Sequence, residues 1–183
     1  ILRAWVASTD FRNEMNFSEE ILERTSDSYR RIRNTIRFLI SNLDDFDLKN
    51  DDLDLFKYTE IDKWIIEKAN DLQEQIKLDY DNYEIHLAFQ KILSFCSNEL
   101  GSFYLDIIKD RLYTSKKDGA ARKSSQLAIY HVLNGLIRWI APILSYTAEE
   151  AYQEFKKDKS SVFLLEWYEA VSYTHLTLPT IVS

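Results

Sequence analysis

The chain has 183 residues, a formal net charge of −7, 45% hydrophobic residues and 29% charged residues, which is typical of a soluble globular protein. Cys96 is the only cysteine, so a disulfide framework and a cysteine-based zinc site are both excluded within the chain. The acidic total argues against nonspecific nucleic-acid binding, and no apolar run is long enough to span a membrane.

Only 3 Gly and 2 Pro residues interrupt the sequence, which favours long helices. The first predicted helix covers residues 18–43, with Ser18 as its N-cap. Its apolar residues recur at three- and four-residue steps: Ile21, Leu22, Tyr29, Ile32, Ile36, Leu39, Ile40 and Leu43. The Asp-rich residues 44–58 break this period and are predicted to form a surface loop.

Four further helices are predicted after that loop. They cover residues 60–80, a stretch that starts near residue 84, residues 122–141, and a short stretch that starts at 147. Thr59 with Asp62, and Thr147 with Glu150, are spaced as capping pairs at two of the starts. Gly101 is expected to bend the third helix or to let another helix approach closely. The pattern as a whole predicts an all-α fold, an antiparallel helical bundle.

The end of the sequence differs from the rest. Residues 161–169 are predicted to form a short extended segment, and residues 171–183 contain no Lys, Arg, Asp or Glu. This change in composition suggests a foreign or disordered tail.

Positive charge is concentrated in two segments of this acidic chain. Residues 21–40 carry five Arg against Glu23 and Asp27, and residues 109–123 carry six Lys or Arg against two Asp. Between these segments, residues 42–84 carry 14 Asp or Glu and 5 Lys. A local basic site is compatible with the acidic total, because the field at a surface depends mainly on nearby charges.

The arginines of the first segment fall on one side of the predicted helix. At about 100° per residue, a stripe roughly a quarter-turn wide holds Arg30, Arg33, Asn34 and Arg37. Arg31 points elsewhere and is predicted to pair with Asp27. The stripe is either a solvated face with some ion pairs or an array of guanidinium groups for phosphates, with Asn34 able to reach a base or a ribose.

The spacing of other reactive side chains predicts neither a metal site nor a catalytic centre. His86, His131 and His175 lie far apart and lack the spacing of metal ligands. Cys96 lies on the apolar stripe of the third helix and is predicted to be a buried thiol. The sequence contains no glycine-rich phosphate loop and no nucleophile elbow.

Four stretches together resemble isoleucyl-tRNA synthetases, which are class I aminoacyl-tRNA synthetases. The stretches are LRAWVASTDFRNEM (2–15), SYRRIRNTIRFLISNLDDFD (28–47), FCSNELGSFYLDIIKDRLYT (95–114) and RWIAPILSYTAEEAY (138–152). The resemblance covers about residues 1–169, and GSFYLDIIKDR at 101–111 is its most specific part. The last stretch marks only the wider group, so the equivalent domain of a valyl-, leucyl- or methionyl-type enzyme stays an alternative.

The resemblance implies that the sequence is a fragment that follows the catalytic domain of a longer enzyme. Residues 1–19 would end the stem-contact or connecting segment, and residues 20–170 would form a helical anticodon-binding domain. The cytoplasmic parent would ligate isoleucine to its tRNA with ATP and Mg in its catalytic domain. Both ATP-binding signatures are absent here, so the fragment is expected to have no catalytic residue, cofactor or metal. Its expected partners are tRNA and the catalytic domain of its own chain, and no membrane.

The same resemblance favours contact between the arginine stripe and the tRNA backbone. In that family the helix also packs against the catalytic half, so a role for Arg30 and Arg33 in bridging domains stays open. By resemblance, Lys109, Arg111 and Tyr113 are predicted anticodon contacts, with Tyr113 stacking on an unstacked base. Charge alone adds Lys116, Lys117, Arg122 and Lys123. A helical protein–protein interaction module stays the alternative function.

Overall fold

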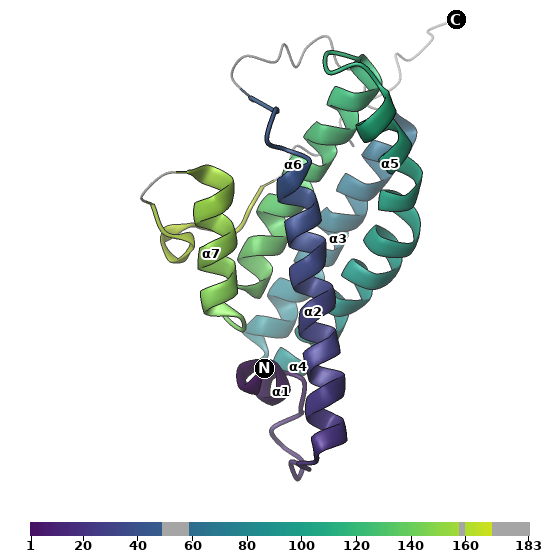
Figure 1. The fold of residues 1–183 in the computed structure, drawn as a ribbon. Coiled ribbons are helices and arrows are strands. Elements are labelled where there is room, and N and C mark those ends of the chain that lie inside the picture. The colour runs from purple at the N-terminus through teal and green to yellow at the C-terminus, as the bar shows by residue number, and fades with distance from the viewer. Residues whose placement is uncertain (49–58, 158–159, 170–183) are drawn as a thin grey trace, which may run out of the picture.

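The computed structural model describes residues 1–48, 59–157 and 160–169, which form helices and no strand (Figure 1). The elements are α1 (Leu2–Ala7), α2 (Glu19–Ser41), α3 (Glu60–Asp81), α4 (Ile85–Ser94), η2 (Phe95–Tyr104), α5 (Leu105–Thr114), α6 (Ala120–Ile140), α7 (Ser145–Lys156) and η3 (Val162–Leu164). The predicted all-α bundle is confirmed. Within the described residues, no helix is both long and apolar enough to cross a lipid bilayer.

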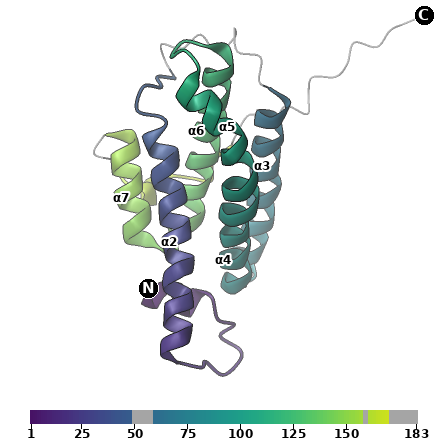
Figure 2. The same ribbon diagram turned by 45° about the vertical axis from the view of Figure 1, so that its right-hand side comes forward.

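Helix α6 is the centre of the bundle. It packs against α2, α3, α4, α5 and α7, and Figure 2 shows the other long helices standing around it. Residues on every side of α6 are buried, including Leu127, Ile129 and Leu133. A helix that is apolar on all sides is expected in the interior. Pro142 lies two residues after Ile140, the last residue of α6, and prevents the helix from continuing, as predicted.

Helix α2, by contrast, buries only one side. Ser18 is its N-cap, as predicted, and the Ser18 hydroxyl accepts a hydrogen bond from the Ile21 amide at 3.2 Å. Ile32, Ile36 and Leu39 of its apolar stripe are buried in the core. The opposite side of α2 therefore faces solvent along most of the bundle.

Residues 85–114 form one helical path of three consecutive segments, α4, η2 and α5. The middle segment, η2, is a π-helix, and the Ser102 hydroxyl donates to the Ser97 carbonyl, five residues earlier, at 2.8 Å. A Cβ atom added to Gly101 would lie 2.9 Å from the carbonyl oxygen of Cys96. The glycine thus accommodates the wide turn of the π-helix, which often occurs at functional positions.

The predicted capping box at the start of α7 was wrong. Helix α7 begins at Ser145, and the structure shows no side-chain cap there. Thr147 lies within the first turn, and its hydroxyl is 3.2 Å from the Tyr29 hydroxyl of α2. The Thr147 side chain is therefore used for contact between two helices instead of for a cap.

Residues 160–169 cross the bundle as the short helix η3 followed by extended chain, close to the predicted extended segment. Gln73 of α3 joins this segment to the core. Its amide nitrogen donates to the Tyr168 carbonyl at 2.7 Å, and its amide oxygen accepts from the Trp139 indole at 3.0 Å. Residues 49–58 of the predicted loop and the predicted tail at 171–183 lie outside the described residues.

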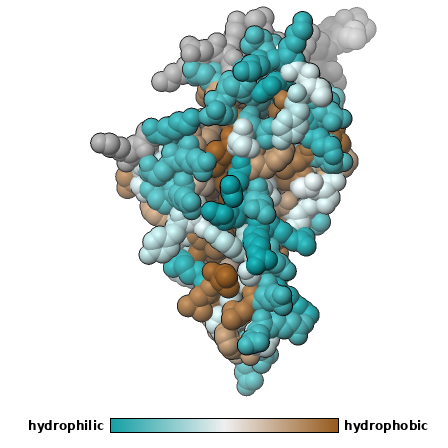
Figure 3. All heavy atoms as spheres, in the orientation of Figure 1, coloured by the Kyte–Doolittle hydropathy of each residue, from teal (hydrophilic) through white to brown (hydrophobic). Residues whose placement is uncertain are grey.

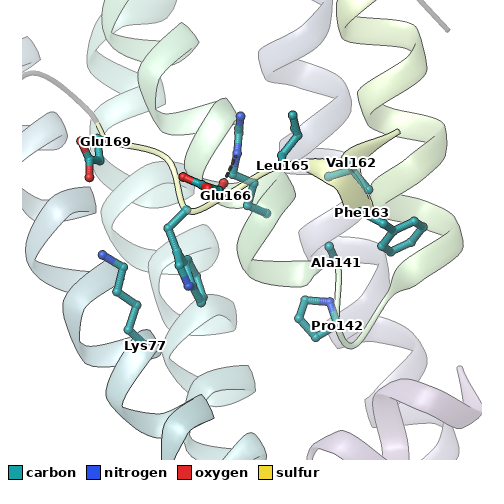
Figure 4. Close-up of a pocket in the computed structure, with 10 residues that line it drawn as sticks. Lys77, Ala141, Pro142, Val162, Phe163, Leu165, Glu166 and Glu169 are labelled. Atoms are coloured by element: carbon teal, nitrogen blue, oxygen red, sulfur yellow. Dashed lines mark hydrogen bonds between the residues drawn. The ribbon is translucent and has the colours of Figure 1, made fainter. Parts of the chain in front are cut away.

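An open pocket of about 570 Å³ lies beside this crossing segment (Figure 4). Lys77 stands on one side of the pocket, and Pro142 and Phe163 stand on the other. Arg138 fixes the segment at the pocket's edge, because its Nε donates to the Glu166 carbonyl at 2.9 Å. The pocket thus results from the way residues 160–169 are laid over the ends of α3 and α6.

Candidate nucleic-acid interface

The predicted arginine stripe forms a ridge along α2. Helix α7 lies on one side of α2, and η2 and α5 lie on the other (Figure 2). On the face drawn in Figure 3, hydrophilic residues follow the course of α2. Arg30, Asn34 and Arg37 are exposed, whereas Arg33 is half-buried. The ridge therefore separates two grooves.

The groove between α2 and α7, here the α2–α7 groove, has balanced charge. Its volume is about 200 Å³, and it is lined by Arg33, Ile36, Arg37, Ile40, Thr147, Glu150, Ala151 and Glu154. The Arg33 Nη2 atom lies 3.8 Å from Glu150 Oε1. Two guanidinium groups thus share the groove with two carboxylates, which lowers its attraction for a phosphate.

The other arginines of α2 differ in their partners. Arg30 Nη1 donates to Asp27 Oδ1 at 3.0 Å, so the predicted pairing of Asp27 with Arg31 was wrong. On a helix, the residues three and four positions after Asp27 both lie next to it, so spacing alone does not decide between Arg30 and Arg31. Within residues 1–48, 59–157 and 160–169, Arg37 has no hydrogen-bond or ion-pair partner. Arg37 is therefore the member of the stripe most available to an anion.

The second groove lies between α2 and the η2–α5 segment and is here called the α2–α5 groove. It is shallow, has a volume of about 360 Å³, and is lined by Asn34, Thr35, Phe38, Gly101, Leu105, Asp106, Lys109 and Tyr113. Most of its wall is apolar. The fold thus places Asn34 of the first basic segment beside Lys109 and Tyr113 of the second.

The rim of the α2–α5 groove carries groups suited to a polar ligand with an aromatic ring. Lys109 donates a hydrogen bond to Asp106, and this bond raises the pKa of Lys109. The Tyr113 side chain is 67% exposed, so its ring is accessible for stacking. The Asn34 amide offers both a donor and an acceptor.

Arg111 points away from this groove. It is two residues from both Lys109 and Tyr113, which places it on the other side of α5. Its Nη1 atom donates to the Thr59 hydroxyl at 3.0 Å and lies 3.8 Å from Asp62 Oδ2. The guanidinium group is thus directed into the bundle, and its assignment to the anticodon stays a prediction.

The basic residues from 116 to 123 also divide into two kinds. Arg122 Nη2 donates to both oxygens of Asp45, at 2.8 and 3.1 Å, and its side chain is 16% exposed. Lys123 is 6% exposed and lies 5.7 Å from the centre of the Phe46 ring. Among residues 116–123, the exposed cations are Lys116 and Lys117.

Residues 62–180 match the family described as the anticodon-binding domain of tRNA ligase. The chain belongs to this family. Because the match covers more than half of the chain, it identifies the bundle as an anticodon-binding domain, and the boundary predicted at residue 20 stays a prediction.

Relatives of this anticodon-binding domain are isoleucine–tRNA ligases. The chain is 52% identical to the isoleucine–tRNA ligase of Vesicomyosocius okutanii subsp. Calyptogena okutanii (strain HA) over 168 residues. These aligned residues make up 92% of the chain. The ligase of Legionella pneumophila (strain Lens) is 52% identical to the chain over 171 residues, or 93% of the chain. The ligase of Shewanella oneidensis is 49% identical over 181 residues, or 98% of the chain. The chain spans only 18% or 19% of the length of these relatives. The resemblance inferred from the sequence is confirmed.

Cys96 and His131 serve packing in the domain. Cys96 is buried, as predicted, and burial raises the pKa of its thiol to about 12. Burial also lowers the pKa of His131 to about 4, and its Nδ1 lies 2.7 Å from the Tyr168 hydroxyl. Among the described residues, no three His, Cys, Asp or Glu side chains are grouped to hold a metal ion.

Three residues of the domain's candidate site were missed in the sequence. Phe38 forms part of the α2–α5 groove, and its position four residues after Asn34 was the available signal. Glu150 faces Arg33 from another helix, and no local pattern indicates that pairing. Asp62 was assigned only to a cap, although it is completely buried.

Proposed function

We propose that the chain binds the anticodon arm of tRNA as the anticodon-binding domain of an isoleucine–tRNA ligase. The observation that carries this proposal is the α2–α5 groove, which gathers Asn34, Lys109 and Tyr113 around an apolar floor. Such a groove suits an unstacked base better than it suits a solvated row of ion pairs, because single-stranded RNA is bound by stacking and edge contacts.

A base would enter the α2–α5 groove edge first. Tyr113 and Phe38 offer ring faces for stacking, and the Asn34 amide offers hydrogen bonds to the base edge. Lys109 lies beside the same groove and offers a cation to the adjoining phosphate. This arrangement combines recognition of a base with attachment of the backbone next to it.

The ridge of α2 supplies further contacts with the RNA backbone. Arg37 is free to form forked bonds with a phosphate. Arg30 and Arg33 would exchange Asp27 and Glu150 for phosphate oxygens, which costs little because exposed ion pairs contribute about 0–1 kcal/mol. These contacts would position the RNA and would not distinguish its sequence.

A second function, docking to the catalytic domain of the same parent chain, is favoured by an apolar face around α1. Leu2, Val6 and Phe11 are 65%, 51% and 67% exposed, and Figure 3 shows hydrophobic surface gathered over α1. With Ile85, Pro142 and Ile143 they line a groove of about 400 Å³. Exposed apolar patches mark interaction sites, and the much longer relatives imply a further domain able to cover this one.

The parent enzyme would ligate isoleucine to tRNA in the cytoplasm, with ATP and Mg bound by its catalytic domain. The present chain would contribute tRNA binding to that reaction and no bond-making group. The purified chain is expected to show no isoleucine-dependent pyrophosphate exchange. Exchange above that of a mock preparation would contradict this assignment.

A titration of the chain with tRNA tests the proposed function. Isoleucine tRNA and a noncognate tRNA are each titrated at two salt concentrations. We expect tighter binding of isoleucine tRNA and a marked loss of affinity at the higher salt, because phosphate contacts release counterions. No binding at low salt, or binding that does not respond to salt, would overturn the proposal and favour the docking function.

A further inference from the structure

Asp62 is a carboxylate with no solvent exposure at the start of α3. Its Oδ1 accepts from the Tyr104 hydroxyl at 2.6 Å, and its Oδ2 accepts from the Ser124 hydroxyl at 2.5 Å and the Thr59 hydroxyl at 2.7 Å. Burial and the nearby Asp62 raise the pKa of Tyr104 well above its ordinary value. Tyr104 thus remains a hydrogen-bond donor to Asp62 across the working pH range.

Arg111 completes this network from the last turn of α5. Its Nη1 donates to the Thr59 hydroxyl that itself bonds Asp62, and it lies 3.8 Å from Asp62 Oδ2. The network therefore joins the start of α3, the end of η2, the start of α6 and the last turn of α5. These four points come together at one end of the bundle.

A buried carboxylate is a poor choice for stability alone. A well-packed apolar side chain is often equally stabilising there, because the carboxylate must lose its water. Hydrogen bonds, however, have directions that apolar contacts lack. The network around Asp62 thus restricts the rotation and position of α5 relative to α3 and α6.

We propose that Asp62 and Arg111 are positioning residues for the α2–α5 groove. Arg111 anchors the inner side of α5 near its end, and Lys109 and Tyr113 stand on the outer side of the same helix. The pair thereby sets where these two side chains stand relative to Asn34 of α2. Arg111 acts through α5 and does not touch the RNA. This inference rests on the proposed function, because it concerns the placement of the groove's rim.

Substitutions of the pair are tested with the 183-residue chain by tRNA titration at several salt concentrations. Arg111→Ala and Asp62→Asn are each expected to weaken binding of isoleucine tRNA about tenfold. The salt slope, which is the slope of the logarithm of affinity against the logarithm of salt concentration, should be unchanged because no phosphate contact is lost. Arg111→Lys keeps a cation near Asp62 and is expected to recover part of the affinity. Lys109→Ala is the matched control on the same helix, and it should reduce the salt slope by about one.

Hydrogen exchange of the free chain provides a readout that does not depend on RNA. Amides of residues 108–114 should exchange faster in Arg111→Ala and Asp62→Asn than in the wild type, and should be unchanged in Lys109→Ala. Should Asp62→Asn fail to fold, Arg111→Ala and Arg111→Lys carry the comparison, because the Arg111 side chain is 31% exposed.

Three results would overturn the inference. A salt slope lowered by about one in Arg111→Ala would make Arg111 a direct phosphate contact. Tighter binding by Asp62→Asn would mean that Asp62 holds back a binding arginine. Unchanged exchange at residues 108–114 would show that the pair positions nothing. If the wild type itself binds no tRNA, the proposed function fails, whereas the exchange experiment still decides the role of the pair.

Discussion

Helix α2 and the stretch from α5 into α6 are the two basic segments of the chain, and their charges are used differently. On α2, Arg30 and Arg37 stand exposed on a ridge. In the second segment, Arg111 and Arg122 form hydrogen bonds within the bundle, at 3.0 Å to Thr59 and 2.8 Å to Asp45. The arginines of the two segments thus differ in exposure, whereas the exposed cations of the second segment are lysines such as Lys116 and Lys117.

The difference follows from how much of each helix is buried. Helix α2 has one apolar stripe, so cations on its other side stay in solvent. Helix α6 is buried on all sides, and cations near its start are therefore drawn into the protein or need a partner. A count of basic residues along a sequence consequently overestimates a binding surface wherever the segment leads into the core.

The largest expected effect that tests this comparison is on the stability of the second segment. Arg122→Met should lower the free energy of unfolding by about 2 kcal/mol, because Asp45 loses a charged hydrogen-bond partner that is itself mostly buried. Urea denaturation gives the measurement. Lys117→Met, an exposed neighbour, is the control and should stay within about 0.5 kcal/mol of the wild type. If Arg122→Met leaves the free energy of unfolding unchanged but reduces the salt slope of tRNA binding, Arg122 contacts the RNA instead.

The next largest effect is on the affinity for tRNA, and it concerns the exposed Tyr113 of the second segment. Tyr113→Ala should weaken binding of isoleucine tRNA about tenfold, or about 1.4 kcal/mol, because a stacked base loses its platform. Tyr113→Phe retains the ring and should bind like the wild type. Titration of cognate and noncognate tRNA measures both. Equal losses for every tRNA would argue against contact with a base that differs between them.

A smaller effect is expected on the ridge of α2. Arg37→Ala should weaken binding of cognate and noncognate tRNA alike by a few-fold and reduce the salt slope by about one, because one phosphate contact is lost. Arg24→Ala is the control near the start of the same helix, where Arg24 pairs with Glu20 at 2.5 Å. A fall in melting temperature with normal binding would make Arg37 a structural residue.

The last prediction is a pH dependence that separates the paired from the exposed arginines. Burial acts to raise the pKa of Asp45, but hydrogen bonds from Gln126 and the charge of Arg122 outweigh burial and lower it. A lowered folded-state pKa gives stability that is present above the ordinary value of 3.8 and is lost as the pH falls through the folded-state value.

The difference in unfolding free energy between wild type and Arg122→Met should therefore be full at pH 7 and shrink below about pH 4. Urea titrations across this range measure it. The difference in unfolding free energy between wild type and Arg37→Ala should not change with pH, since Arg37 has no carboxylate partner in the described residues. A difference that persists at pH 2 would show that Arg122 stabilises the fold by packing alone.

The sequence by itself determined the long helices and the family. Three- and four-residue periodicity is a local property, so the buried stripe of α2, the N-cap at Ser18 and the end of α6 before Pro142 followed from neighbouring residues. The quoted stretches were specific enough to identify an anticodon-binding domain before any fold was known. The exposed ridge with Arg30 and Arg37 was predicted in the same way.

Only the tertiary structure decided which polar groups meet. The capping box at Thr147 was wrong because its hydroxyl lies near Tyr29 of another helix. The resemblance grouped Arg111 with Tyr113 as predicted anticodon contacts. The two lie on opposite sides of α5, and the Arg111 guanidinium lies 3.8 Å from Asp62 of α3. Pairings between helices depend on their relative rotation, which packing of the whole core sets and no local pattern encodes.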